Sequence, residues 1–143
     1  MPISSARYFQ AYRQNQVTTA DPGTILLLLY QGAIDFLRQA KTSLERGDMA
    51  EKGWCVTRAL AIISELLTSL NFAVGGEVAR NLEGLYLFML DQITTANIGN
   101  DPTPFAETIA LLCTLKEGWE EAIAAERRRV AQESHDHSLG ARA

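Results

Sequence analysis

Cysteine and histidine are scarce in this chain, and disulfides and most transition-metal sites depend on them. Its 143 residues include two cysteines and two histidines. Cys55 and Cys113 each lie inside a helical pattern without CxxC spacing and without an adjacent histidine, so a zinc knuckle or a thioredoxin-like motif is unsupported. We expect both to be reduced, buried thiols. His135 and His137 fall near the end of the chain, and we expect neither a metal nor another cofactor.

Long hydrophobic runs are also missing. The longest uninterrupted apolar run extends from Ile25 to Tyr30, far short of the ~20 residues that span a bilayer. Residues 1–7 lack the basic start and apolar stretch of a signal peptide. A net charge of −4 gives no general attraction to nucleic acid or anionic lipid. The sequence therefore predicts a cytoplasmic protein that neither inserts into membranes nor binds nucleic acid.

The arrangements that carry catalysis are absent as well. There is no glycine-rich phosphate loop, and no serine or cysteine nucleophile has a histidine at hand. A di-iron bundle would need Glu-x-x-His pairs inside its helices, where no histidine lies. The acidic residues fall mostly off the apolar stripes, as on a solvated helix face. We expect a protein that is not an enzyme.

What the chain does contain is helical periodicity. Apolar residues recur every three or four positions through most of the sequence, which keeps one stripe of a helix facing a partner. Asp21-Pro22 is a strong helix start, and Asp48 with Glu51 resembles a capping box. The expected helices cover about 21–47, 48–71, 77–97 and 105–133.

Short connections between these helices predict an antiparallel arrangement. We expect the second helix to end at Gly75-Gly76, because glycine takes the left-handed conformation that terminates helices. The predicted fold is all-α: an antiparallel up-down-up-down four-helix bundle with a short N-terminal helical cap. Residues 1–20 would form the cap, 21–133 the bundle and 134–143 a disordered tail.

The start of the first helix is apolar around its whole circumference, from Ile25 to Tyr30. One face of a bundle helix cannot bury so many apolar side chains. A second surface must cover them, and the N-terminal segment, a neighbouring helix and a partner protein are three open alternatives.

Three motifs point to a known family. They are Ala11-Tyr12-x-x-Asn15-Gln16-Val17-x-Thr19-Ala20-x-Pro22, then Leu29-Tyr30-x-Gly32-Ala33, and finally Ile62-Ile63-Ser64-Glu65-Leu66-x-x-x-Leu70-Asn71-x-x-x-Gly75-Gly76-Glu77. In order and spacing they resemble the FliS family, the flagellin-specific export chaperones of bacterial flagella. The resemblance covers roughly Ala11 to Arg127. Gly23 and Gln31 depart from it, since acidic residues are common at those places in the family.

The resemblance implies a cytosolic four-helix bundle that binds the C-terminal segment of new flagellin. It would prevent premature polymerisation and aid delivery to the flagellar export gate, while other flagellar regulators are further candidate partners. The client's amphipathic helices would lie in apolar grooves after the N-terminal cap moves aside. The candidate client-binding residues are Tyr12 and Val17 in the cap, Ile25, Leu29, Tyr30 and Ala33 in the first helix, and Ile62, Leu66, Leu70 and Asn71 in the second.

For the last four of these residues, client contact and core packing remain alternatives. The function has an alternative too: a self-associating helical bundle without an export client, in which the extra apolar face serves a homodimer.

Overall fold

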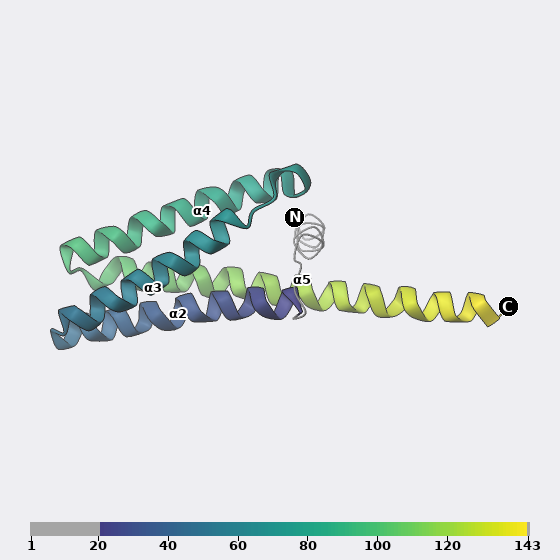
Figure 1. Cartoon of the computed structure of the whole chain (residues 1–143), viewed down its shortest axis with the longest axis horizontal. Helices are drawn as coiled ribbons and strands as arrows, with labels where there is room; N and C mark the ends of the chain where they lie inside the picture. The colour runs from purple at the N-terminus through teal and green to yellow at the C-terminus, as the bar shows by residue number, and fades with distance from the viewer. Residues whose placement is uncertain (1–20, 143) are drawn as a thin grey trace.

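The computed structural model describes residues 21–142, and this part of the chain is helical with no strand (Figure 1). The expected all-α four-helix bundle is confirmed. The expected cap, with Tyr12 and Val17, lies outside the described residues. The four helices are α2 (Pro22–Arg46), α3 (Met49–Thr68), α4 (Phe72–Gly99) and α5 (Pro102–Arg142).

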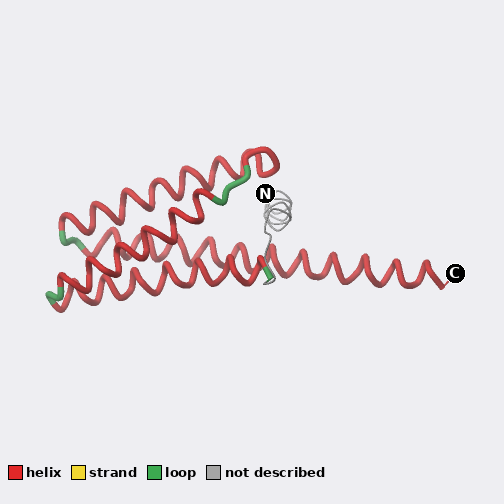
Figure 2. Tube along the Cα trace, in the orientation of Figure 1, coloured by secondary structure: helices red, strands yellow, loops and turns green. Residues whose placement is uncertain are grey.

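The helices close into a ring in chain order. α3 packs on α2, α4 packs on α3, and α5 packs on both α4 and α2. Figure 1 shows the α3–α4 pair diverging from the α2–α5 pair toward the end where α3 meets α4. Short connections join the successive helices (Figure 2). The up-down-up-down topology follows from these connections, because a short loop leaves the next helix no other direction.

Local capping sets most of the helix ends. The Asp21 side chain accepts a hydrogen bond from the Gly23 N–H at 3.3 Å, with Pro22 in the first turn. Gly47 ends α2 with a φ of 80°, and Asp48 Oδ1 accepts from the Glu51 N–H at 3.1 Å to start α3. Each cap satisfies backbone groups that a helix end leaves without an intrahelical partner. These three boundaries agree with the expectation from the sequence.

Asp21 also joins the start of α2 to α5. A hydrogen bond from the Thr24 hydroxyl lowers the pKa of the Asp21 carboxyl, and the Arg127 guanidinium at 2.6 Å lowers it further. A carboxyl whose pKa is lower in the folded state stabilises the fold at neutral pH. That contribution is lost as the pH falls through the folded-state pKa, which lies below the ordinary value of an aspartate.

We predict that Asp21→Ala lowers the free energy of unfolding by about 1 kcal/mol, because it removes a helix cap. Asp21→Asn is the matched control, since asparagine caps almost as well but cannot form the ion pair. Urea unfolding at pH 7 measures both variants. The difference between the wild type and Asp21→Asn should shrink as the pH falls below the ordinary pKa of an aspartate, because the carboxyl then protonates. Equal losses in the two variants would contradict a capping role.

The expected end of the second helix at Gly75-Gly76 is wrong. α3 ends at Thr68, and a new helix begins after Asn71, whose side-chain oxygen accepts from the Val74 N–H at 3.2 Å. The glycines therefore fall inside α4. Gly76 has a φ of 53° and a ψ of −123° and forms a kink there. The physical reason is the Asn71 cap, which restarts the helix before the glycines are reached.

Residues 134–142 also differ from the expected disordered tail. α5 stays helical to Arg142 and projects past the bundle as a single helix (Figure 1). Side chains four residues apart support this extension, with Arg129 bonded to Glu133 and Gln132 to Asp136. No proline interrupts it after Pro104. Local hydrogen bonding thus continues the helix where apolar packing has ended.

Three aromatic side chains tie three helices together in the core. The Tyr30 hydroxyl of α2 is hydrogen-bonded to the Tyr86 hydroxyl of α4. The Trp119 indole N–H of α5 donates to the same Tyr30 oxygen at 3.0 Å. Each of these rings is buried, so every polar tip needs a partner inside the protein. This cluster fixes the rotation of α2 about its axis and decides which of its residues reach the surface.

Candidate functional site

Three of the candidate client-binding residues lie in the core. Tyr30, Ala33 and Leu66 are buried, so as folded here they do not reach the surface. They are buried because of their positions around the helix axes. Leu26, Tyr30, Ala33 and Leu37 recur every three or four positions along the inner stripe of α2. Leu66 belongs to the corresponding stripe of α3.

Ile25, Leu29 and Ile62, by contrast, lie partly exposed. Ile25 and Leu29 continue at helical spacing through Gly32 to Phe36, which places all four along one edge of α2. Because α2 and α3 run antiparallel and pack together, this edge follows the junction between the two helices.

Contacts across the junction define its α3 side. The rings of Phe36 and Trp54 meet edge to face, with centroids 5.6 Å apart and planes at 77°. The Arg58 guanidinium lies 5.3 Å from the centre of the Trp54 ring. At Gly32 a Cβ atom would stand 3.2 Å from Ile62 Cδ1, so glycine permits the close approach of the two helices there.

We call this surface the α2–α3 seam. It consists of Ile25, Leu28, Leu29 and Phe36 from α2 with Trp54 and Ile62 from α3.

Two seam residues are much more exposed than an apolar side chain in a packed bundle. Leu28 is 65% exposed and Trp54 is 52% exposed. Leu28 belongs to the segment that is apolar all round, and the structure leaves it exposed while Leu26 and Tyr30 are buried. Leu28 agrees with the expectation that one face of the bundle cannot bury the whole segment. Exposed apolar side chains that gather on one surface mark interaction sites.

Sequence reasoning missed Leu28, Phe36 and Trp54 as individual site residues. Trp54 carried a usable signal, because it lies outside the stripe of buried α3 residues that includes Cys55, Val56 and Ala59. A tryptophan on the polar side of an amphipathic helix is unusual, and tryptophan is enriched at protein interfaces. Phe36 carried no such signal, since its spacing also fits the core.

Leu70 and Asn71 lie apart from the seam's centre, in the connection from α3 to α4. Both are partly exposed. The Asn71 side chain caps α4, so a structural role explains this asparagine whether or not it meets a client.

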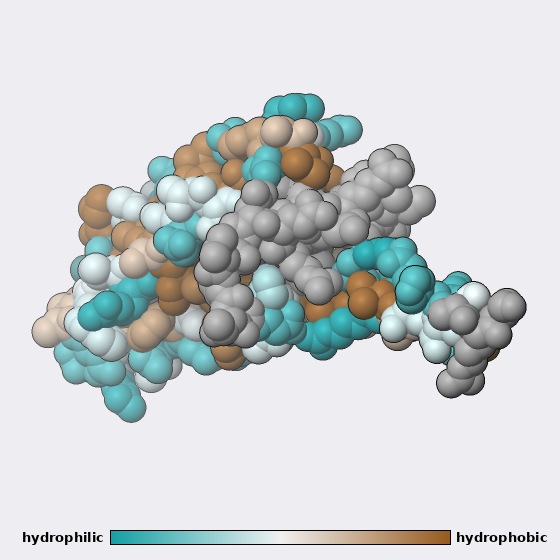
Figure 3. Space-filling view, turned by 45° about the vertical axis from the view of Figure 1, so that its right-hand side comes forward, coloured by the Kyte–Doolittle hydropathy of each residue, from teal (hydrophilic) through white to brown (hydrophobic). Residues whose placement is uncertain are grey.

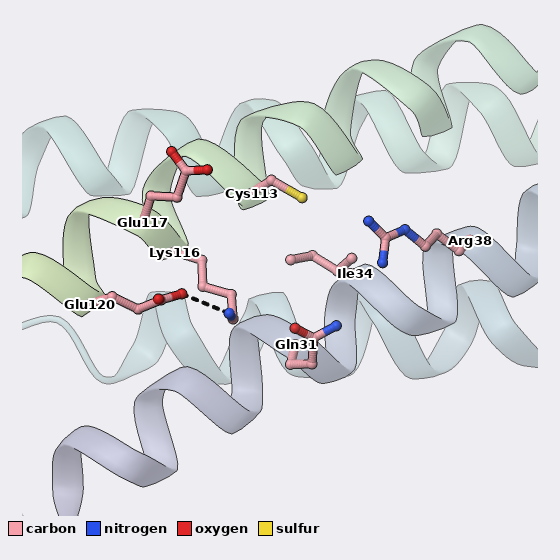
Figure 4. Close-up of a pocket in the computed structure, with 7 residues that line it drawn as sticks. All are labelled: Gln31, Ile34, Arg38, Cys113, Lys116, Glu117 and Glu120. Atoms are coloured by element: carbon pink, nitrogen blue, oxygen red, sulfur yellow. Dashed lines mark hydrogen bonds and ion pairs between the residues drawn. The ribbon is translucent and has the colours of Figure 1, made fainter.

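The clearest hollow between α2 and α5 is polar. It has a volume of about 260 Å³, and Figure 4 shows Gln31, Arg38, Lys116 and Glu120 around it, with Lys116 bound to Glu120 at 2.7 Å. A smaller apolar hollow of about 130 Å³ lies between α4 and α5 beside Trp119. Charged and solvated side chains line this hollow, and Cys113 in its wall has no histidine beside it among the lining residues to act as its base.

These surfaces carry few groups with metal-binding or nucleophilic chemistry. Within residues 21–142, His, Cys, Asp and Glu form no group of three or more that could hold a metal ion. Burial raises the pKa of the Cys55 thiol, which makes that sulfur less reactive. Cys113 is only partly buried, which corrects the expectation of two core thiols. None of the helices described is both long and apolar enough to cross a membrane.

The seam is thus suited to binding an apolar helix face. Exposed aromatic and aliphatic side chains supply the area, and Gly32 lets α2 and α3 approach each other closely beneath them.

Known proteins resemble this chain over most of its length. The model of the family described as flagellar protein FliS matches residues 4–126. The chain is 38% identical over 114 residues to flagellar secretion chaperone FliSB of Pseudomonas aeruginosa, covering 80% of this chain and 90% of that protein. It is 37% identical over 116 residues to flagellar secretion chaperone FliS of Vibrio cholerae, with 78% and 85% covered.

A third relative gives a similar match. The chain is 35% identical over 120 residues to flagellar secretion chaperone FliS of Bacillus subtilis, covering 84% of this chain and 89% of that protein. These relatives are named as chaperones and not as enzymes, which confirms the expectation that the chain is not an enzyme. By its match to the family model and to these relatives, the chain belongs to the FliS family.

Proposed function

We propose that this protein is a flagellar secretion chaperone that binds the C-terminal segment of flagellin on the α2–α3 seam. In the cytoplasm it would hold the segment apart from other flagellin subunits and so prevent premature polymerisation. It would then aid delivery of the client to the flagellar export gate. Family membership supports the chaperone role, and the exposed apolar seam is the observation that supports the binding site.

The dimensions of the seam fit a short amphipathic helix. From Ile25 to Phe36 the α2 edge spans about 16 Å, at 1.5 Å per residue. That length holds about three turns of a client helix, whose residues at i, i+3 or i+4 and i+7 would pack between the two chaperone helices. Arg58 lies beside Trp54 of the seam, and Asp35 is exposed on α2 next to Phe36. Polar residues of the client helix would remain at this charged rim.

The other candidate residues also have roles in this proposal. Tyr12 and Val17 would belong to an exchangeable cover that leaves the seam when the client arrives. Tyr30, Ala33 and Leu66 would act from beneath, because they pack in the core on which α2 and α3 rest. Leu70 and Asn71 would meet the client where it passes the α3–α4 connection.

The test is isothermal titration calorimetry of the purified protein with the C-terminal segment of flagellin from the same organism. We expect saturable binding with one segment per chaperone, and a negative change in heat capacity because apolar surface is buried. An N-terminal flagellin segment is the control and should give no binding heat. Absence of heat at two temperatures, with the helical circular dichroism spectrum intact, would refute flagellin as the client.

A further inference from the structure

The junction between α2 and α3 continues beyond Phe36 into a second polar hollow, with a volume of about 270 Å³. Gln39 and Ser43 follow Phe36 at intervals of three and four residues, so they prolong the edge of α2 that forms the seam. The Gln39 side chain reaches α3, where its Oε1 accepts from the Cys55 thiol at 3.5 Å. The residues that line the hollow are Arg38, Gln39, Thr42, Ser43 and Arg46 of α2 with Glu51 of α3.

Two guanidinium groups line this hollow, and both have hydrogen-bond donors to spare. Arg46 is exposed, and within residues 21–142 its side chain takes part in no ion pair. Arg38 has Asp35 as its ion-pair partner, at 4.0 Å and with both side chains more than half exposed, so the pair contributes little. With two arginines and one glutamate among its lining residues, the hollow has a formal charge of +1. We call it the basic hollow.

Helix stability accounts for only one of the two arginines. Arg46 lies in the last turn of α2, where a cation meets the negative end of the helix dipole. Arg38 lies two turns earlier, and the effect of the dipole is confined to the terminal turn. Two guanidinium groups that line one hollow are suited to a carboxylate, because each presents N–H donors in a planar fork that matches its two oxygens.

The two ends of the seam also differ in charge. The basic hollow adjoins one end, and Arg58 lies on the same half of the seam beside the Trp54 ring. Toward the other end α3 exposes the carboxylate of Glu65, one turn after Ile62. Figure 3 shows hydrophilic side chains gathered toward the lower left, where Figure 1 places the connection from α2 to α3. An apolar helix that lies in the seam therefore meets cations at one of its ends and a carboxylate near the other.

We propose that the basic hollow binds the terminal α-carboxylate of flagellin, at the end of the segment that lies in the seam. This inference rests on the proposed function and deepens it, because a client that is the C-terminal segment of its protein ends in a free carboxylate. Arg38 and Arg46 donate to the carboxylate oxygens, and capture of a chain end by cationic and polar groups is a known mode of peptide recognition. The Glu51 carboxylate repels the same group, so it limits the affinity of the site.

This site fixes the direction and the length of the bound client helix. The client helix runs parallel to α2 and antiparallel to α3, with its C-terminus toward Arg46. The negative end of its dipole then faces the arginines, and its positive end faces Glu65. From Ile25 to Ser43 the edge of α2 spans about 27 Å, at 1.5 Å per residue. About 18 residues at the end of flagellin, or five helical turns, therefore lie along the seam and the hollow.

The test is titration calorimetry of the full chain with the flagellin C-terminal segment in two forms, one with a free terminal carboxylate and one with a terminal carboxamide. The two forms differ in charge only at the last residue. The free acid should bind about tenfold more tightly, as expected for charge-assisted hydrogen bonds at a partly exposed site.

Variants of the hollow then locate the carboxylate. Arg38→Gln and Arg46→Gln should each weaken binding of the free acid by about three- to tenfold and leave binding of the amide within about twofold. Glu51→Gln removes the like charge and should tighten binding of the free acid by about threefold. Arg80→Gln, at an exposed position of α4, is the matched control and should keep the full preference for the free acid. Glutamine forms helices about as well as arginine, so all these variants should keep the wild-type circular dichroism.

The outcomes separate this inference from the proposed function. Equal affinities of the wild type for the two forms would overturn the carboxylate site and leave the seam as the flagellin site. If the arginine variants weakened both forms by the same factor, the hollow would bind an acidic side chain of the client, and the inference would again be wrong. Absence of binding by either form would refute the proposed function and this inference with it.

Discussion

Replacing Trp54 with alanine is expected to weaken binding of the flagellin C-terminal segment by about 30- to 700-fold, a loss of about 2–4 kcal/mol. Trp54 is the largest exposed side chain of the α2–α3 seam, and it is already held in place by Phe36 and Arg58. A large apolar ring that is ordered before binding loses little entropy when a client covers it. Titration calorimetry at a few micromolar protein measures the effect.

Phe88→Ala is the matched control for this variant. Phe88 and Trp54 are nearly equally exposed aromatic residues, but Phe88 lies on the outer face of α4. Its truncation should leave flagellin affinity within about twofold of the wild type, as expected outside an interface. Both variants should unfold in urea close to the wild type, since neither side chain is buried. Similar flagellin affinities in Trp54→Ala and the wild type would exclude the seam as the binding site.

Leu66→Ala is expected to lower the free energy of unfolding by about 2–5 kcal/mol, because it leaves a cavity in a packed core. Leu66 lies on the buried stripe of α3 together with Val56, Ala59 and Ile63. Urea unfolding followed by circular dichroism measures the change. The result also decides between the two alternatives that the sequence left open for this residue, core packing and client contact.

Leu28→Ala removes the same atoms from an exposed position of α2. Its effect on unfolding should stay within about 0.5 kcal/mol, while its effect on flagellin affinity should be the larger one. Leu66→Ala should show the opposite pattern when measured below its unfolding transition. A loss of less than about 0.5 kcal/mol in Leu66→Ala would show that Leu66 is not core and would restore it as a client-contacting residue.

Several helix boundaries could be predicted from the sequence because their signals are local. Asp21 and Asp48 cap the residues two or three positions ahead, and Gly47 adopts a conformation that few other residues tolerate. The Gly75-Gly76 prediction failed because two local signals compete within six residues. The Asn71 cap restarts a helix first, and the glycine conformation then appears as a kink inside α4.

The candidate site was predictable only in part. Periodicity identified Ile25, Leu29 and Ile62 as apolar residues, but it assigned the same status to Tyr30, Ala33 and Leu66, which the structure buries. A stripe of apolar residues indicates that a helix has a buried side. It does not indicate how wide that side is, or where the neighbouring helix stops covering it.

By itself, the sequence determined the helical class, the antiparallel order of the four helices and the family, since these depend on short-range periodicity, caps and motifs. The tertiary structure alone decided which apolar residues remain exposed. The hydrogen bonds from Tyr30 to Tyr86 and Trp119 join residues 56 and 89 positions apart, and they set the rotation of α2 against its neighbours. That rotation leaves Leu28 exposed, and the packing of α2 on α3 brings Trp54 to Phe36. Contacts between distant parts of the chain made this surface, and no local pattern contains them.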